Sequence, residues 1–331
     1  MNILVMGSGL IGTQRIQALT ANPAVSSIAV HDPKLREGTP VAAKAKAVTR
    51  DEAFGRRYDA ALVATPHDTA VELVPQVAKH APALLLEKPL GRSLAEAERL
   101  VACARDAGSR IFVGLNYRFL KHVQEAKRLL STGELGRVLG VDAVLSHGAQ
   151  PGYDKSWKTD PVRCGGGVCI DPGVHVFDLL CWFFGGAELT GGLLSRTFWP
   201  IQVEDHASLI LTLPGGAPAN LVMSLSSWQS RMEMTIETEN KQIILRGRGK
   251  FYGAQRLIIA AKWPWLQPKQ PREREFNYGL EDNSLQDETN AFLTVVGGAA
   301  SDCNLATAED ALRAMRIVDD CYAKVQHGRS W

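Results

Sequence analysis

The chain has 331 residues, of which 45% are hydrophobic and 22% are charged, and its formal net charge is +2. This composition is typical of a globular protein with a large core, and the length favours two domains over one. The small net charge is not gathered in one long basic run, so nucleic acid is not an expected partner.

The first part of the chain alternates between short apolar runs and helical patterns. Strand–helix alternation of this kind predicts a doubly wound parallel sheet with right-handed crossovers, the α/β Rossmann architecture. We therefore expect residues 1–119 to form a dinucleotide-binding domain. Ser93 is placed to cap one of the predicted helices. The predicted strands are residues 2–6, 26–33, 59–65, 83–87 and 110–116.

A glycine motif, Gly-x-Gly-x-x-Gly, lies between the first predicted strand and the first helix. Gly7 suits a tight turn, Gly9 lets the backbone approach a pyrophosphate, and Gly12 lets the helix pack on its strand. Asp32 follows Gly12 by 20 residues, the spacing at which a carboxylate meets the adenosine ribose, and it favours NAD over NADP. The alternative is a purely structural glycine turn. The cofactor residues predicted here are Gly7, Gly9, Leu10, Ile11, Gly12 and Asp32.

Polar residues also follow the later predicted strands. Ligands of parallel sheets gather at the carboxyl ends of the strands, which makes these residues candidates for the cofactor site. Lys88 comes directly after a run of leucines that we expect to be buried. Burying an ammonium group there costs free energy, so we expect Lys88 to have a function. Glu87 has a structural alternative as an acceptor of backbone hydrogen bonds. The candidates are Thr65, Pro66, His67, Glu87, Lys88 and Asn116.

The second part of the chain, residues 120–331, has a different pattern. Strands follow one another with turns between them, which predicts an α+β domain with a mainly antiparallel sheet. The Pro-rich segment 262–275 is typical of a loop, and two helices are expected at 285–298 and 307–326. The predicted strands are 137–148, 207–214, 219–228, 231–240, 241–247 and 255–263.

Three consecutive glycines, at 165–167, precede a second group of polar residues. If a helix begins near Pro172, Asp171 caps it and His175 lies one turn further on the same side. The alternative is a capped helix with an ordinary core histidine. Aromatic and cationic neighbours suit a sugar face and a phosphate or carboxylate, although each alone also fits a core or solvated position. The substrate candidates are Lys88, Tyr117, Arg118, Trp157, Lys158, Arg163, Asp171 and His175.

Cysteine usage and hydropathy bear on the cellular compartment. The six cysteines include no Cys-x-x-Cys pair, so we expect reduced thiols and neither a disulfide framework nor a metal site. The chain opens directly into a predicted strand, and its most apolar later run carries Asp178. A cytoplasmic protein without a membrane partner is expected.

The three motifs together resemble the Gfo/Idh/MocA oxidoreductase family, and "GLNYRF", "STGELGRV" and "TAEDALRAMRIVDDCY" extend the likeness over nearly the whole chain. The resemblance implies a Rossmann domain and an open-faced, mainly antiparallel sheet that often forms homodimer or homotetramer contacts. It also implies NAD or NADP and a polyhydroxylated substrate held between the domains. One departure is Ala70, which stands where the family often has a histidine after Thr-Pro. The motifs are the glycine turn, Glu87-Lys88-Pro89, and Asp171-x-Gly173-x-His175-x-x-Asp178 after the glycines.

The resemblance assigns the catalytic roles to Lys88, Asp171 and His175. Oxidation of a secondary alcohol needs a proton acceptor, and an imidazole titrates near neutral pH whereas a lysine needs burial or a neighbouring positive charge to act as a base. We expect His175 to accept the proton, Lys88 to bind the reacting oxygen and Asp171 to orient the site. The first two roles can also be exchanged.

The chain is similar to bacterial UDP-N-acetylglucosamine 3-dehydrogenases and their uronic-acid relatives, which prepare a 3-keto sugar for an aminotransferase. The resemblance therefore implies oxidation of a nucleotide sugar at its 3-hydroxyl for amino-sugar biosynthesis. An inositol or free-sugar dehydrogenase is the alternative within the family. A nicotinamide-binding regulator without turnover is the alternative from another class.

Overall fold

The computed structural model describes residues 1–263, 272–300 and 304–327, and the chain forms two compact units. The first boundary falls between Asn116 and Tyr117, close to the residue 119 expected from the sequence. Two later segments that we had placed in the second domain, Val162–Gly165 and Ser284–Met315, belong to unit 1. Unit 1 is Met1–Asn116, Val162–Gly165 and Ser284–Met315, and unit 2 is Tyr117–Pro161, Gly166–Asn283 and Arg316–Trp331.

Unit 1 contains a seven-stranded sheet in the order β3-β4-β2-β1-β5-β6-β7. All its pairings are parallel except β3 with β4, which confirms the predicted Rossmann architecture. The short β3–β4 hairpin was not predicted. The strands are β1 (Asn2–Met6), β2 (Ser27–His31), β3 (Pro40–Ala42), β4 (Ala45–Ala47), β5 (Ala60–Val63), β6 (Ala83–Glu87) and β7 (Arg110–Gly114).

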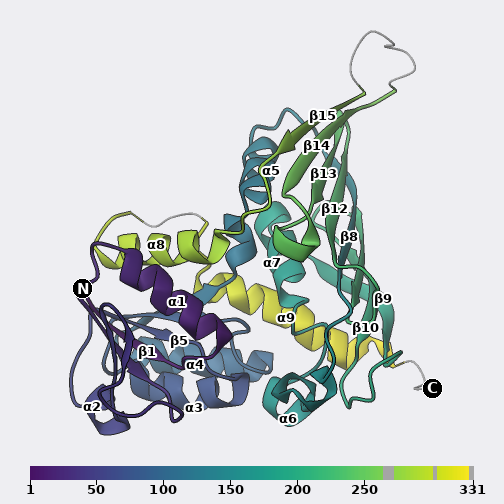
Figure 1. The fold of residues 1–331 in the computed structure, drawn as a ribbon. Helices are drawn as coiled ribbons and strands as arrows, with labels where there is room; N and C mark the ends of the chain where they lie inside the picture. Colours follow the sequence, from purple (N-terminus) through teal and green to yellow (C-terminus); the bar gives the residue numbers. More distant parts are fainter. Residues whose placement is uncertain (264–271, 301–303, 328–331) are drawn as a thin grey trace. The chain divides into compact units, whose positions relative to one another are not determined.

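Helices cover both faces of this sheet, with α1 and α8 on one face and α3 and α4 on the other (Figure 1). Ser93 caps α4 as predicted, because its hydroxyl accepts a hydrogen bond from the Glu96 N–H at 3.3 Å. The helices are α1 (Leu10–Ala21), α2 (Arg50–Phe54), α3 (His67–Val77), α4 (Leu94–Asp106) and α8 (Ser284–Val296).

A buried arginine explains why α8 belongs to unit 1. Arg15 of α1 is 1% exposed, and its guanidinium donates to Glu87 at 2.8 Å and to Glu288 of α8 at 2.5 Å. Removing one member of such a buried ionic group would leave an uncompensated charge, so the group holds α8 against α1. This contact could not be read from sequence spacing, since Arg15 and Glu288 are 273 residues apart.

Unit 2 contains a nine-stranded sheet in the order β15-β14-β13-β12-β8-β11-β10-β9-β16. Its pairings are antiparallel except β8 with β11 and β9 with β16, so the mainly antiparallel prediction is confirmed. β15 begins within the segment that we predicted to be a loop, so that prediction was wrong for residues 273–275. Residues 264–271 of the same segment lie outside the described residues. The strands are β8 (Val138–Ser146), β9 (Glu188–Ser195), β10 (His206–Thr212), β11 (Pro218–Ser224), β12 (Arg231–Thr238), β13 (Lys241–Arg246), β14 (Arg256–Ala261), β15 (Glu273–Asn277) and β16 (Gln326–His327).

The two faces of the unit 2 sheet differ. Along β12 the buried residues Met232, Met234 and Ile236 alternate with more exposed ones, as expected for a strand with one covered face. Figure 1 shows α5 and α7 on the same side of the sheet, and α5 contacts β13 and β14. The remaining helices are α5 (Lys121–Ser131), α6 (Pro161–Cys164), α7 (Val174–Phe184) and α9 (Ala308–Lys324), which passes from unit 1 into unit 2.

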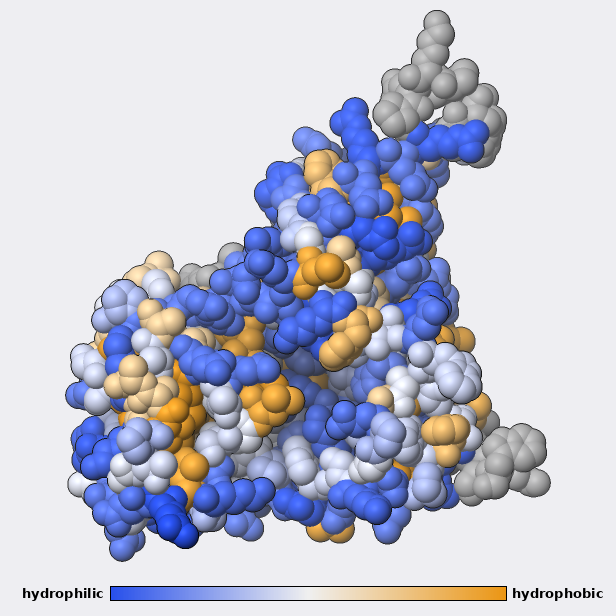
Figure 2. Space-filling view, viewed as in Figure 1, coloured by the Kyte–Doolittle hydropathy of each residue, from blue (hydrophilic) through white to orange (hydrophobic). Residues whose placement is uncertain are grey.

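Within the described ranges, no helix combines the length and hydropathy that a membrane crossing requires. The face drawn in Figure 2 is predominantly hydrophilic, with apolar side chains in separate patches.

Candidate functional site

The glycine turn of unit 1 has the geometry that a dinucleotide requires. Gly7 has a φ of +96°, and a Cβ atom there would lie 2.6 Å from the Ala64 carbonyl oxygen. A Cβ atom on Gly12 would overlap the Gly7 carbonyl group, whereas one on Gly9 would meet nothing within 4 Å. Gly7 and Gly12 are therefore required by the fold itself, and Gly9 borders open space.

The open space at Gly9 fits a pyrophosphate. Gly9 is the N-cap of α1, and the first turn of this helix contains no acidic residue. Free N–H groups at a helix N-terminus attract phosphate oxygens. Leu10 and Ile11, in the first turn of this helix, are 78% and 37% exposed.

Asp32 lies at the end of β2 and is fixed as a carboxylate. It accepts hydrogen bonds from the Ser8 N–H at 2.8 Å and from the Ser8 hydroxyl at 2.9 Å. Burial alone would raise the pKa of Asp32, but hydrogen bonds from the backbone of Lys34 and Ser8 outweigh it and the pKa lies below its usual value. Asp32 is therefore ionised at neutral pH and placed beside the glycine turn.

The other predicted cofactor residues lie at the carboxyl ends of β5, β6 and β7. Thr65 has a buried hydroxyl oxygen that has no hydrogen-bond partner in the described parts of the chain. Pro66 is the N-cap of α3, and His67 is buried with its Nδ1 atom 2.8 Å from the Cys164 carbonyl oxygen. Asn116 donates to the Ser284 hydroxyl at 2.7 Å. The open turn at Gly9, the Thr65 hydroxyl and Asp32 together fit a dinucleotide.

Lys88 directly follows β6. Its neighbour Glu87 accepts from Arg15, so the predicted alternative of a backbone acceptor is replaced by a buried ion pair. Lys88 itself is partly exposed, and the Lys88–Pro89 peptide is cis.

The polar residues that follow the three glycines lie in unit 2, but Asp171 does not cap a helix as predicted. The helix α7 begins at Val174 with Gly173 as its N-cap, so Asp171 is not the cap. Asp171 is 8% exposed, and its carboxylate instead pairs with the Lys158 ammonium at 2.7 Å. The prediction was wrong because the Asp171–Pro172 pair lies in a turn that precedes the helix.

His175 lies in the first turn of α7 and stacks on Tyr117. The two rings are nearly parallel, at an interplanar angle of 5°, with centroids 4.0 Å apart. Burial raises the pKa of Tyr117, so its hydroxyl stays protonated and can donate a hydrogen bond. The structure thus brings together Tyr117 and His175, and separately Lys158 and Asp171, all within unit 2.

The other predicted substrate residues have different surroundings. Arg118 is 1% exposed and donates to Asp178 at 2.8 Å and 2.5 Å. We therefore assign Arg118 a structural role in place of the predicted substrate contact. Arg163 belongs to unit 1, where it pairs with Asp68 at 3.0 Å. Trp157 is half-buried, and the Lys158 ammonium lies 5.9 Å from the centre of its ring.

Four residues that we did not predict complete this part of unit 2. His147 meets the edge of Tyr252 at a centroid distance of 6.4 Å, and burial lowers the pKa of His147 while Asp171 offsets this only in part. Arg248 lies over Tyr117 and Tyr252 and pairs with Asp282. We call the set the unit 2 polar cluster: Tyr117, His147, Lys158, Asp171, His175, Arg248, Tyr252 and Asp282.

A sequence signal for this set existed in the segment "GRGKFYG". Three glycines with positive φ, Gly247, Gly249 and Gly253, flank Arg248 and Tyr252. A glycine-rich turn between two strands is typical of a backbone bend that can position the polar side chains beside it. Among the described residues, no three His, Cys, Asp or Glu side chains are gathered so as to hold a metal ion.

Comparison with known proteins identifies both halves of the chain. Residues 1–115 match the oxidoreductase family with an NAD-binding Rossmann fold, and residues 123–244 match the GFO/IDH/MocA C-terminal domain. Inositol 2-dehydrogenase of Rhizobium meliloti is 27% identical over 65% of this chain and 66% of its own length. Inositol 2-dehydrogenase 2 of Saccharopolyspora erythraea is 24% identical over 99% and 94%.

Solved structures show the same fold. A 3-ketoreductase from Actinomadura kijaniata, in complex with NADP and TDP-benzene, has a TM-score of 0.79 and 19% identity over 100% of this chain and 99% of that one. A levoglucosan dehydrogenase in complex with NADH and L-sorbose has a TM-score of 0.81 and 17% identity over 98% and 96%. With both of its domains matched, the chain belongs to the Gfo/Idh/MocA family of NAD(P)-binding oxidoreductases.

Proposed function

We propose that the protein oxidises a secondary hydroxyl of a nucleotide sugar, at its 3-position, and yields a 3-keto sugar for amino-sugar biosynthesis. The observation that carries this proposal is the unit 2 polar cluster, which joins imidazole, carboxylate, ammonium and guanidinium groups. The 3-ketoreductase with bound NADP and TDP-benzene supports a nucleotide-linked substrate. The inositol 2-dehydrogenases among the relatives favour a second candidate, a neutral cyclitol or free sugar.

We propose NAD as the cofactor in preference to NADP. Gly9 and the N-terminus of α1 would hold the pyrophosphate, and Asp32 would accept hydrogen bonds from the adenosine ribose. The ionised Asp32 would repel a 2′-phosphate. Known structures of the fold contain NADP in one case and NADH in another. Measuring kcat/KM with each nucleotide tests this preference.

We propose catalytic roles for Lys88, Asp171 and His175. Bound NAD(P) supplies the acceptor for the hydride that leaves the carbinol carbon. His175 takes the hydroxyl proton, Lys88 donates a hydrogen bond to the reacting oxygen, and Asp171 acts through its ion pair with Lys158. The roles of His175 and Lys88 are exchanged if the pH profile of the His175→Asn variant retains the wild-type ionisation on its acidic side.

The deciding experiment follows the absorbance of NAD(P)H across UDP-sugars, free hexoses and inositols, with an aminotransferase present to remove the ketone. We expect turnover of a UDP-sugar, and Lys88→Met should abolish it while NADH still binds, as measured by fluorescence. Turnover of inositols alone would favour the second candidate. A Lys88→Met variant that retains wild-type turnover would refute the catalytic assignment.

We also propose a homodimer or homotetramer formed through the face of the unit 2 sheet opposite α5 and α7. Leu193 and Ile210 are 42% and 50% exposed on neighbouring strands of this sheet. Exposed apolar side chains gathered on a sheet face favour self-association. Light scattering of the wild type and of Ile210→Lys tests this, and a monomeric wild type would contradict it.

A further inference from the structure

Arg248 is held in an unusual way for an arginine beside a candidate active site. It lies between two glycines with positive φ in the turn after β13, and its side chain is 26% exposed. Its guanidinium carbon is 5.3 Å from the centre of the Tyr117 ring and 4.5 Å from that of Tyr252. Two aromatic rings therefore fix the plane of the guanidinium before any ligand arrives.

The hydrogen-bonding capacity of Arg248 is only partly used. Its nearest carboxylate oxygen, on Asp282, is 3.5 Å away, whereas charge-assisted hydrogen bonds are about 2.7–2.9 Å long. Its Nε atom is buried and has no hydrogen-bond partner among the described residues. An unmet N–H donor on a largely buried cation costs free energy unless a ligand supplies the acceptor.

The other buried arginines show what a structural arginine looks like in this chain. Arg118 uses Nε and Nη2 on the two carboxylate oxygens of Asp178, at 2.8 Å and 2.5 Å. Arg15 donates to Glu87, Glu288 and Thr289. Neither leaves its Nε without an acceptor. Arg248 differs from these two arginines in that respect, and it shares the unpartnered Nε with Arg256, whose side chain is 40% exposed.

Arg248 is connected to the candidate catalytic residues of unit 2. The ring of Tyr117, which it covers, stacks on His175. The ring of Tyr252, which it also covers, meets His147. A group bound by Arg248 would thus lie on a molecule that also contacts this cluster.

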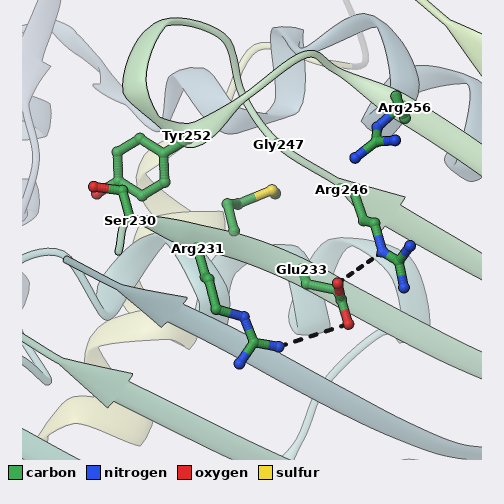
Figure 3. Close-up of a pocket in the computed structure, with 8 residues that line it drawn as sticks. Ser230, Arg231, Glu233, Arg246, Gly247, Tyr252 and Arg256 are labelled. Atoms are coloured by element: carbon green, nitrogen blue, oxygen red, sulfur yellow. Dashed lines mark hydrogen bonds and ion pairs between the residues drawn. The ribbon is translucent and has the colours of Figure 1, made fainter. Parts of the chain in front are cut away.

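Tyr252 also lines a surface pocket that is rich in arginine. Figure 3 shows Arg231 and Arg246 on either side of Glu233, with Arg256 nearby. Glu233 pairs with Arg246 at 2.7 Å and with Arg231 at 3.8 Å, and Arg256 pairs with Glu275 at 3.7 Å, so three guanidinium groups face two carboxylates. The surroundings of Tyr252 are therefore net positive, and they extend the cationic character of Arg248.

We propose that Arg248 binds an acidic group of the substrate, a phosphate or a carboxylate, and that the enzyme selects anionic sugars over neutral polyols. A guanidinium fork matches such oxyanions in two parallel hydrogen bonds. A neutral hydroxyl would not compensate the lost hydration of this cation as an anion does. The inference rests on the proposed function, because it names the substrate class of the same site.

The test compares wild type, Arg248→Met and Arg248→Lys on three groups of substrates: UDP-sugars, free uronates and neutral inositols. We expect Arg248→Met to raise KM for the acidic substrates by at least about tenfold, with Arg248→Lys in between. The UDP-sugar and uronate arms show whether a phosphate or a carboxylate is recognised. Arg137→Met, a change at an 80% exposed arginine of the same unit, is the matched control.

A binding arm keeps this inference separate from the proposed function. Calorimetric titration of each variant with UDP and with glucuronate needs no turnover, and thermal unfolding verifies that the variants fold. Equal affinity of wild type and Arg248→Met for both ligands would overturn the role of Arg248, even if sugars are oxidised. Absence of turnover with every sugar would refute the proposed function, whereas weaker binding of UDP or glucuronate to Arg248→Met would still support the inference.

Discussion

The two units assemble their candidate sites in different ways. In unit 1, most of the residues that fit a dinucleotide lie between Gly7 and Asp32, in the turn after β1 and at the end of β2, and Thr65 follows β5. In unit 2, the polar cluster draws on residues from Tyr117 to Asp282. The first site is thus mostly local in the chain, whereas the second depends on side chains that the whole sheet and α7 bring together.

The largest effect is expected at His175. His175→Asn should lower kcat by about 10²–10⁴-fold, because it removes a general base while the binding residues of unit 1 are untouched. Stopped-flow measurement of kcat and fluorescence titration with NADH would be combined, with a thermal melt to verify folding. A loss of NADH affinity equal to the loss of kcat would contradict the separation between the units.

The next largest effect concerns the buried pair of unit 2. Asp178→Asn leaves the Arg118 charge without a counter-charge at 1% exposure, so the free energy of unfolding should fall by about 3–5 kcal/mol. The matched control is Asp68→Asn in unit 1, whose partner Arg163 is 41% exposed, and this change should cost less than about 1 kcal/mol. Urea denaturation measures both, and similar losses would refute the structural role given to Arg118.

The difference between local patterns and long-range contacts also explains which features could be predicted from the sequence. Alternating strands and helices, and glycines spaced for a turn, are local patterns, so the Rossmann sheet and Gly7, Gly9 and Gly12 were predictable. Arg118 was misjudged because its partner, Asp178, is 60 residues away. Local sequence shows that a cation exists but not which carboxylate will meet it after folding.

Four of the eight residues of the unit 2 polar cluster were not predicted, because they lie far apart in the sequence. His147 follows β8, and Arg248 and Tyr252 follow β13, two strands that are not neighbours in the sheet. Only the pairing of strands and the bends at Gly247 and Gly253 bring these side chains together. The position of Asp171 was missed for a smaller reason, since a helix start was placed two residues too early.

A pH dependence of stability is expected from His122 of α5. This side chain is fully buried, and burial lowers its pKa to about 4. Folded His122 stays neutral while the unfolded chain takes up a proton below its ordinary pKa of about 6.5. Stability is therefore fully present above pH 6.5 and is lost as the pH falls toward 4, by about 3 kcal/mol at most.

Urea denaturation between pH 7.5 and pH 4.5 measures this loss in the wild type and in His122→Gln. The difference between the two should shrink as the pH falls, because the variant has no imidazole to protonate. His147, whose pKa burial also lowers, contributes in the same direction in both proteins and therefore cancels. Parallel curves for the two proteins would show that His122 takes up its proton at the same pH in the folded and the unfolded chain, and would contradict the lowered pKa.

The smallest effect separates fold from function within the glycine turn of unit 1. Gly9→Ala places a methyl group in open space at an extended backbone conformation, so the unfolding free energy of the cofactor-free protein should change by less than about 0.5 kcal/mol. NADH affinity should nevertheless fall at least about tenfold, since that space is where we place the pyrophosphate. Gly12→Ala is the matched variant: its methyl overlaps the Gly7 carbonyl group and should destabilise the protein by about 1–3 kcal/mol. If Gly9→Ala binds NADH as well as the wild type does, the pyrophosphate does not lie at Gly9. The cofactor site of unit 1 would then depend, like the polar cluster of unit 2, on residues that are far apart in the sequence.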